Sequence, residues 1–87
     1  MERSLDPRRK KLLYRSQHRG MKEADLLLGG FVDRHLETMS EDDVSAIESL
    51  LDESDNDLVN WILGRETVPE EIASDVLLRM IAENDDA

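Results

Sequence analysis

The sequence of 87 residues has no cysteine, two prolines, four glycines and one residue each of tryptophan, tyrosine and phenylalanine. Without cysteine, the chain cannot form disulfides, a cysteine-ligated zinc site or a cysteine nucleophile. The low glycine and proline contents exclude collagen-like and low-complexity classes. The length predicts a single domain over residues 1–87, whose small core leaves little room to enclose both a cofactor and a substrate. We therefore do not expect an autonomous enzyme.

Long apolar runs are missing as well. Runs such as residues 26–28 are far shorter than the ~20 residues that a membrane-spanning helix needs. The basic start of the chain is not followed by the apolar stretch of a signal peptide, and Glu2 and Asp6 count against a transit peptide. We expect a cytoplasmic protein that does not insert into membranes.

Basic residues are scarce outside the first quarter of the chain. The formal net charge is -10, yet residues 1–22 carry eight basic and two acidic side chains, and residues 23–87 carry three basic and nineteen acidic ones. A basic head on an acidic body suits an acidic patch on a protein partner and repels nucleic acid elsewhere. Solubility and a solvated first helix are the alternative explanation.

The apolar residues recur with helical spacing in every segment. Asp6 and Pro7 predict the start of a first helix, which runs towards His18 and is ended by Gly20. A second helix is expected from about residue 21 to 39, with one apolar face. The pair of glycines at positions 29 and 30 predicts close packing against another element, or a kink.

Three shorter helices complete the prediction. Ser40 and the acids after it start a third helix, and Ser54 starts a fourth, which places Trp61 in the core and ends at Gly64. Pro69 starts a fifth helix that runs to residue 81, and residues 1–5 and 83–87 are expected to fray. No segment has the alternation of a strand. The predicted fold is all-α, a compact bundle of about five short helices.

Few residues could carry chemistry. His18 and His35 are not spaced as metal ligands; we expect His18 at the end of the first helix and His35 on a face of the bundle. The acidic runs at 41–43 and 55–57 lack the glycine of a calcium loop, and capping explains both. No glycine-rich phosphate loop is present. We predict no catalytic residue, no metal site and no cofactor-binding residue.

Residues 19–23 allow two interpretations. Arg19 and Glu23 are four residues apart, so they could share a helix face as a pair worth ~0.3–0.5 kcal/mol, with Gly20 as a helix terminator. Alternatively, the segment is a recognition site. Glycine lets a partner backbone approach, arginine offers a fork for a carboxylate or carbonyl, and glutamate offers an acceptor.

A resemblance to a known family supports the second interpretation. Residues 14–25, YRSQHRGMKEAD, resemble the RGxxE signature of the assembly factors of succinate dehydrogenase, the bacterial SdhE proteins and their mitochondrial relatives. Residues 57–61, DLVNW, resemble the D-L-aromatic-N-W stretch of that family, although Val59 stands where many members have an aromatic residue. Pro69, followed by a helix that contains Arg79, matches its last segment. The likeness covers about residues 6–84.

The resemblance implies an assembly factor, a dedicated chaperone, that binds the flavoprotein subunit of succinate dehydrogenase and promotes covalent attachment of FAD. Fumarate reductase is a second candidate client. The implied client-binding residues are Arg19, Gly20, Met21 and Glu23, and FAD is handled by the client, so this chain binds no cofactor stably. We expect a free monomer. The alternatives are a small nucleic-acid-binding protein that uses the basic helix from Arg8 to Arg19, and, with less support, an autonomous flavin transferase.

Overall fold

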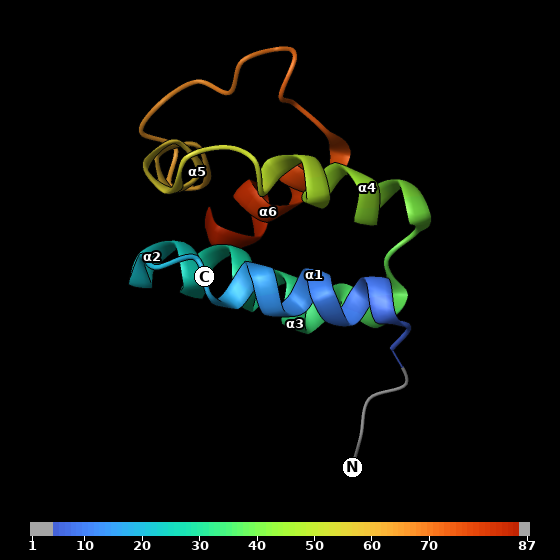
Figure 1. Ribbon diagram of the computed structural model, residues 1–87. Helices are drawn as coiled ribbons and strands as arrows, with labels where there is room; N and C mark the ends of the chain where they lie inside the picture. The colour runs from blue at the N-terminus through green and yellow to red at the C-terminus, as the bar shows by residue number, and fades with distance from the viewer. Residues whose placement is uncertain (1–4, 86–87) are drawn as a thin grey trace.

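The computed structural model describes residues 5–85, which form helices and loops without any strand (Figure 1). The predicted all-α fold is confirmed. Because α2, a π-helical turn and α3 follow one another without a break, the described residues form five helical segments, as expected. The elements are α1 (Pro7–Gln17), α2 (Lys22–Ala24), the π turn (Asp25–Gly29), α3 (Gly30–His35), a 3₁₀ turn (Leu36–Thr38), α4 (Glu41–Leu50), α5 (Asp55–Ile62) and α6 (Asp75–Asp85).

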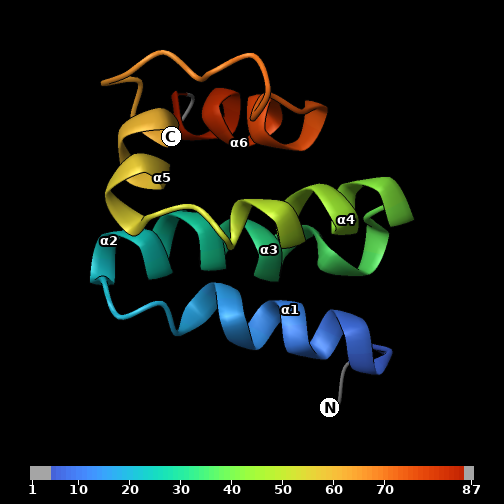
Figure 2. The ribbon, with the colours of Figure 1, turned by 45° about the horizontal axis from the view of Figure 1, so that its top comes forward.

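The helices pack around one aliphatic core. α1 runs antiparallel to the α2–α3 segment and lies beside it, and α4, α5 and α6 form a second layer over this pair, with α4 against α1 and α5 against α2 (Figure 2). Every helix longer than one turn contributes fully buried side chains, among them Leu12, Leu28, Ile47, Leu58 and Leu77. Trp61 is 6% exposed and packs in this core, which confirms its predicted role as a core anchor.

The predicted starts of α1, α4 and α5 are confirmed by their hydrogen bonds. Asp6 accepts from the backbone N–H of Arg9 at 2.8 Å, and Pro7 is the first residue of α1. The hydroxyls of Ser40 and Ser54 each accept from the N–H three residues later at 3.1 Å, in front of α4 and α5. These side chains satisfy N–H groups that the first helical turn leaves without a partner.

The close packing predicted at Gly29 is confirmed. A Cβ atom at this position would lie 2.9 Å from the carbonyl oxygen of Ser16 and 2.9 Å from Cγ of Gln17, so α1 can approach the π turn only because the residue is glycine. Ser16 is fully buried at this crossing, and its hydroxyl donates to the carbonyl of Leu12 at 2.7 Å.

The last helix differs from its prediction at both ends. It begins at Asp75 rather than Pro69, because residues 69–73 form a separate turn and the hydroxyl of Ser74 caps α6 by accepting from the N–H of Leu77 at 3.2 Å. The helix continues to Asp85, beyond the predicted end at residue 81, and the expected fraying of residues 83–85 stays a prediction. Leu5 is described, without helical structure, and packs against the core. The remaining positions expected to fray, 1–4 and 86–87, lie outside the described residues.

Candidate functional site

The candidate site lies at the corner where the chain leaves α1 and enters α2. α1 ends at Gln17, and His18 follows with its ring Nδ1 2.8 Å from the carbonyl oxygen of Tyr14, as expected for a residue at the helix end. Gly20 then adopts φ 93°, a left-handed conformation that strains other L-residues. Met21 is extended, with φ -124°, directly before α2 begins.

Arg19 is held by the protein itself. Its side chain is 13% exposed, and its Nε donates to Oδ1 of Asp55 at 2.5 Å. Nη1 donates to the carbonyl of Leu51 at 2.9 Å, and Nη2 donates to the carbonyl of Glu53 at 2.7 Å. Its backbone N–H donates to Oδ1 of Asp25 at 2.7 Å. The guanidinium therefore satisfies carbonyls after the end of α4 and ties the α1–α2 corner to the start of α5.

These contacts change the interpretation of Arg19. The hypothesis of an Arg19–Glu23 pair on one helix face is wrong, because Arg19 lies outside the helices and its guanidinium is occupied by other acceptors. The resemblance implied that Arg19 contacts the client directly. The geometry favours another role, in which Arg19 fixes the position of the residues that follow it.

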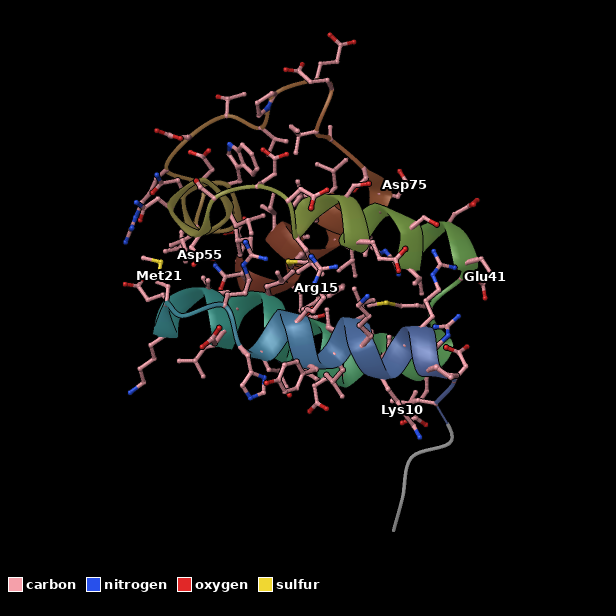
Figure 3. All side chains as sticks on the ribbon, in the orientation of Figure 1. Lys10, Arg15, Met21, Glu41, Asp55 and Asp75 are labelled. Carbon is pink, nitrogen blue, oxygen red and sulfur yellow. The ribbon has the colours of Figure 1, made fainter. Side chains whose placement is uncertain are left out.

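The other three predicted site residues lie together at the surface, and we call Gly20, Met21 and Glu23 the corner site. Gly20 and Glu23 are exposed, and Met21 is half-buried at the end of the molecule where α1 meets α2 (Figure 3). No atom lies within 4 Å of the place where a Cβ at Gly20 would stand. Within residues 5–85 the carboxylate of Glu23 has no hydrogen bond or ion pair. The corner site therefore offers an open backbone, a thioether and a carboxylate to a partner.

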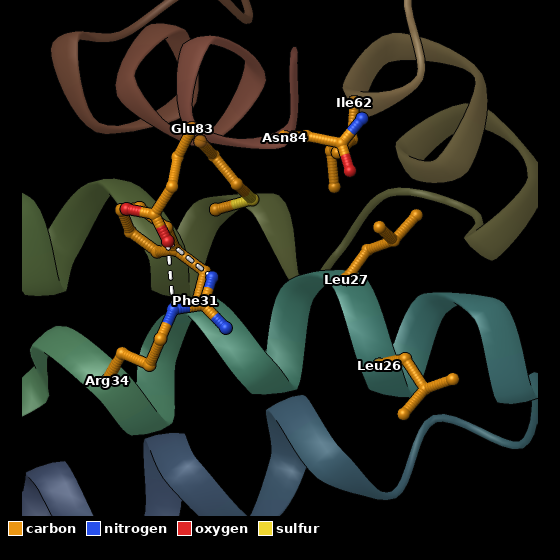
Figure 4. Close-up of a pocket in the computed structure, with 8 residues that line it drawn as sticks. Leu26, Leu27, Phe31, Arg34, Ile62, Glu83 and Asn84 are labelled. Atoms are coloured by element: carbon orange, nitrogen blue, oxygen red, sulfur yellow. Dashed lines mark hydrogen bonds and ion pairs between the residues drawn. The ribbon is translucent and has the colours of Figure 1, made fainter. Parts of the chain in front are cut away.

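A groove of about 490 Å³ opens one helical turn beyond Glu23. Its apolar wall comes from the α2–α3 segment and faces the ends of α5 and α6 (Figure 4). Leu26 stands at its edge and is 64% exposed. The groove is lined by Leu26, Leu27, Phe31, Arg34, Ile62, Met80, Glu83 and Asn84.

Comparison with known proteins identifies the family. Residues 10–85, which include the corner site and Arg19, match the family described as flavinator of succinate dehydrogenase. The chain belongs to this family. The resemblance inferred from the RGxxE segment is thereby confirmed at the level of the family.

Named relatives of this flavinator family come from bacteria and mitochondria. The chain is 39% identical over 83 residues to the FAD assembly factor SdhE of Acetobacter pasteurianus, covering 95% of this chain and 76% of that protein. It is 44% identical over 73 residues to the mitochondrial succinate dehydrogenase assembly factor 2 of Dictyostelium discoideum, covering 84% of this chain and 52% of that protein. The corresponding factor of Saccharomyces cerevisiae is 37% identical over 82 residues, covering 91% of this chain and 51% of that protein. The chain thus spans about half the length of these mitochondrial relatives.

The charged side chains at one end of the groove pair with one another. Arg34 donates to Glu83 through Nε at 2.8 Å, and Nε2 of His35 lies 2.7 Å from the other carboxylate oxygen. Partial burial opposes ionisation of Glu83, but the hydrogen bonds from Arg34 and His35 outweigh it and hold the pKa of this carboxyl below its ordinary value. The resulting stabilisation is full above the ordinary pKa of glutamic acid and is lost as the pH falls through the lowered value. His35 is half-buried beside Phe31, on a face of the bundle as expected.

The described residues contain no recognisable metal-binding site and no membrane-spanning helix. Residues 5–85 hold no group of three or more metal-ligating side chains. None of the helices in this range is long and apolar enough to cross a bilayer. The absence of a metal and of a stably bound cofactor stays a prediction.

Sequence reasoning missed the residues that hold Arg19 in this flavinator-family chain. Asp55 was interpreted only as an acid of a helix start, and the carbonyls of Leu51 and Glu53 lie 32 and 34 residues from Arg19 along the chain. Carbonyl groups are the same at every position, so no sequence signal marks them as acceptors. The groove was missed for a similar reason, because its walls come from three separate segments.

Proposed function

We propose that this chain is an assembly factor that binds the flavoprotein subunit of succinate dehydrogenase and promotes covalent attachment of FAD to it. The observation that carries the proposal is family membership over residues 10–85, a stretch that includes the exposed corner site. The relatives described above bear the names of an FAD assembly factor and of succinate dehydrogenase assembly factors. Fumarate reductase as a second client, a cytoplasmic location and a monomeric free state belong to the same proposal.

The chemistry of the corner site fits a helper rather than a catalyst. Gly20 exposes backbone, Met21 offers an adaptable apolar contact and Glu23 offers an acceptor, which are groups that recognise another surface. FAD and the residue to which it becomes attached belong to the client. The factor then acts by binding the attachment-competent arrangement of the client more tightly than other arrangements. To raise the attachment-competent arrangement from about 1% to about 99% of the client, the factor must bind it about 10⁴-fold more tightly than the other arrangements.

The alternative of nucleic-acid binding through the first helix has less support. Arg8 donates to Glu41 and Glu48, and Arg9 donates to the carbonyls of Leu36 and Met39. These two arginines and Arg19 are therefore committed to acceptors within the chain, which weakens a continuous basic surface along α1.

Glu23→Ala should abolish flavinylation of the client and change the free energy of unfolding by less than about 0.5 kcal/mol. The reason is that the exposed carboxylate supports no contact within the described residues, while it is placed to meet a partner. The measurement is co-expression of the flavoprotein subunit with each variant, followed by in-gel flavin fluorescence. Glu66→Ala, which removes an exposed carboxylate from the loop before α6, is the matched control and should leave fluorescence unchanged.

Two results would contradict the proposal at different levels. A folded Glu23→Ala variant that supports normal flavinylation would remove Glu23 from the site. A client that acquires the same amount of covalent flavin with and without the unsubstituted chain would refute the assembly function itself.

The isolated chain should bind free FAD weakly or not at all. The described residues offer no glycine-rich phosphate cradle, and the guanidinium at the groove, Arg34, is already paired with Glu83. Isothermal titration calorimetry of the pure chain with FAD checks this. A sub-micromolar dissociation constant would contradict it and favour a flavin transferase.

A further inference from the structure

The cations of the described residues fall into two groups. Most arginines are held by acceptors of the chain itself, in α1, in the α1–α2 corner, in α3 and in α6: Arg8, Arg9, Arg19, Arg34 and Arg79. The other five cations have no ion pair within residues 5–85, and three of these five lie on α1: Lys10, Lys11 and Arg15, with Lys22 and Arg65 elsewhere. In a chain with 21 acidic and 11 basic residues, unpaired cations on one helix are unexpected.

These cations surround an exposed aromatic stack. Tyr14 is 64% exposed, and its ring stacks on that of His18 with centroids 4.1 Å apart and planes 17° apart. Contact between Nδ1 of His18 and the carbonyl of Tyr14 fixes the second ring. We call Lys10, Lys11, Tyr14, Arg15 and His18 the α1 outer face, because these side chains lie on the exposed side of a helix that buries Leu12 and Ser16.

Acidic side chains of α4 border the α1 outer face. Glu41 and Glu48 of α4 lie along one flank, where they bind Arg8. Figure 3 shows Arg15 on the side of α1 that faces α4 and Lys10 on the side that points away from it. The hydrogen bond from Arg8 lowers the pKa of Glu48, and the nearby charges of Lys11 and Arg15 add to this effect, so the Glu48 carboxylate is charged at neutral pH. At 1.5 Å per residue, α1 is only about 16 Å long.

We propose that the α1 outer face docks an acidic segment of the client flavoprotein subunit, an inference that rests on the proposed function. A nucleic acid would extend beyond this short face onto the α4 carboxylates, whereas a confined acidic patch on a folded protein fits it. The rest of the chain repels such a patch, since the net charge is -10. An acidic partner therefore approaches α1 first. Because Gly20 follows His18 by two residues, this orientation brings the corner site to the client.

Neutralising the face should slow association with the client. The variant is Lys10→Gln, Lys11→Gln and Arg15→Gln in the full chain, and the probe is the purified flavoprotein subunit in stopped-flow or surface-binding kinetics. The association rate constant should fall about tenfold at low ionic strength. The variant and the unsubstituted chain should associate equally fast at about 0.5 M salt, because salt screens the long-range attraction that steers the two partners together. The dissociation rate should change less than about twofold.

Two further variants separate local charge from net charge and from folding. Arg65→Gln, Thr67→Glu and Ala73→Glu change the net charge by the same amount at exposed positions of the loop between α5 and α6, far from α1 (Figure 2), and should slow association much less. Lys10→Arg, Lys11→Arg and Arg15→Lys keep the charges and should restore the rate of the unsubstituted chain.

Tyr14→Ala should raise the dissociation rate about threefold without changing the association rate, because the ring supplies packing rather than long-range attraction.

The outcomes distinguish this inference from the proposed function. A neutralised variant that associates as fast as the unsubstituted chain, or a net-charge control that slows equally, overturns the docking role of the face alone. An unsubstituted chain that fails to bind the flavoprotein subunit at any salt concentration refutes the proposed function and the inference with it. The unsubstituted chain can also be tested against a single-stranded nucleic acid of about 20 nucleotides. If the neutralised variant loses binding to this strand but associates with the client normally, the face belongs to nucleic acid and the inference is overturned.

Discussion

Replacing Arg19 with alanine should lower the melting temperature of this chain by roughly 10–20 °C, at about 4–8 °C for each kcal/mol in a domain of this size. The substitution removes three hydrogen bonds from a guanidinium that is 13% exposed, and it leaves Asp55 and the carbonyls of Leu51 and Glu53 without their donor. Loss of one partner from a largely buried charged pair costs about 2–3 kcal/mol when part of the site stays open to water. Thermal denaturation followed by circular dichroism measures the shift.

Matched variants show whether the effect comes from the position of Arg19. Arg8→Ala removes an arginine with an ion pair at the exposed surface, and its melting transition should stay close to that of the unsubstituted chain. Arg19→Lys keeps the charge but not the planar fork, so its melting temperature should lie between those of the other two variants. If Arg19→Ala melts normally and still loses client binding, Arg19 contacts the client directly, and the positioning role is wrong.

Gly20→Arg should abolish flavinylation of the client, and it should do so by obstruction in addition to backbone strain. With φ 93°, any side chain here strains the turn by roughly 1–2 kcal/mol, yet no atom of the chain lies within 4 Å of the added Cβ. The introduced side chain therefore projects outward, where it holds a partner away from the backbone. Flavin fluorescence of the co-expressed client and the melting temperature must be measured on the same preparations.

The chain contains a matched control for the strain. Gly64 also has positive φ, 75°, with no atom within 4 Å of an added Cβ, and it lies after α5 rather than at the corner site. Gly64→Arg should lower the melting temperature by a similar amount and leave flavinylation intact. Equal losses of flavinylation in both variants would show that destabilisation alone explains the effect at Gly20.

Local signals allowed most of the fold to be predicted. Asp6, Ser40 and Ser54 each cap a helix through a contact three residues away, so the sequence contains both partners of the contact. The start of α6 was placed six residues too early because Pro69 opens a turn, and Ser74, not Pro69, caps the helix. A proline marks a place where a helix can begin, but the chain here makes one turn and stops.

The site was predictable only in part. Spacing and resemblance located the segment from Arg19 to Glu23. Gly20 has a positive φ there, a backbone conformation that favours glycine over other residues. Spacing also suggested that Arg19 and Glu23 face each other, which is wrong because that geometry requires a continuous helix through Gly20. The acceptors of the Arg19 guanidinium come from the α4–α5 connection and the first residue of α5, whose approach depends on tertiary packing that no local pattern encodes.

The contact between Arg19 and Asp55 spans 36 residues, and it makes the motif dependent on the second half of the chain. A synthetic peptide that ends before α4 would contain every residue of the RGxxE segment and none of the acceptors of its guanidinium. Such a peptide is not a minimal binding unit, and it should compete poorly with the intact factor for the client. Fixing of Arg19 requires the residues that begin α5, so a nascent chain carries the motif before it contains the groups that hold its arginine.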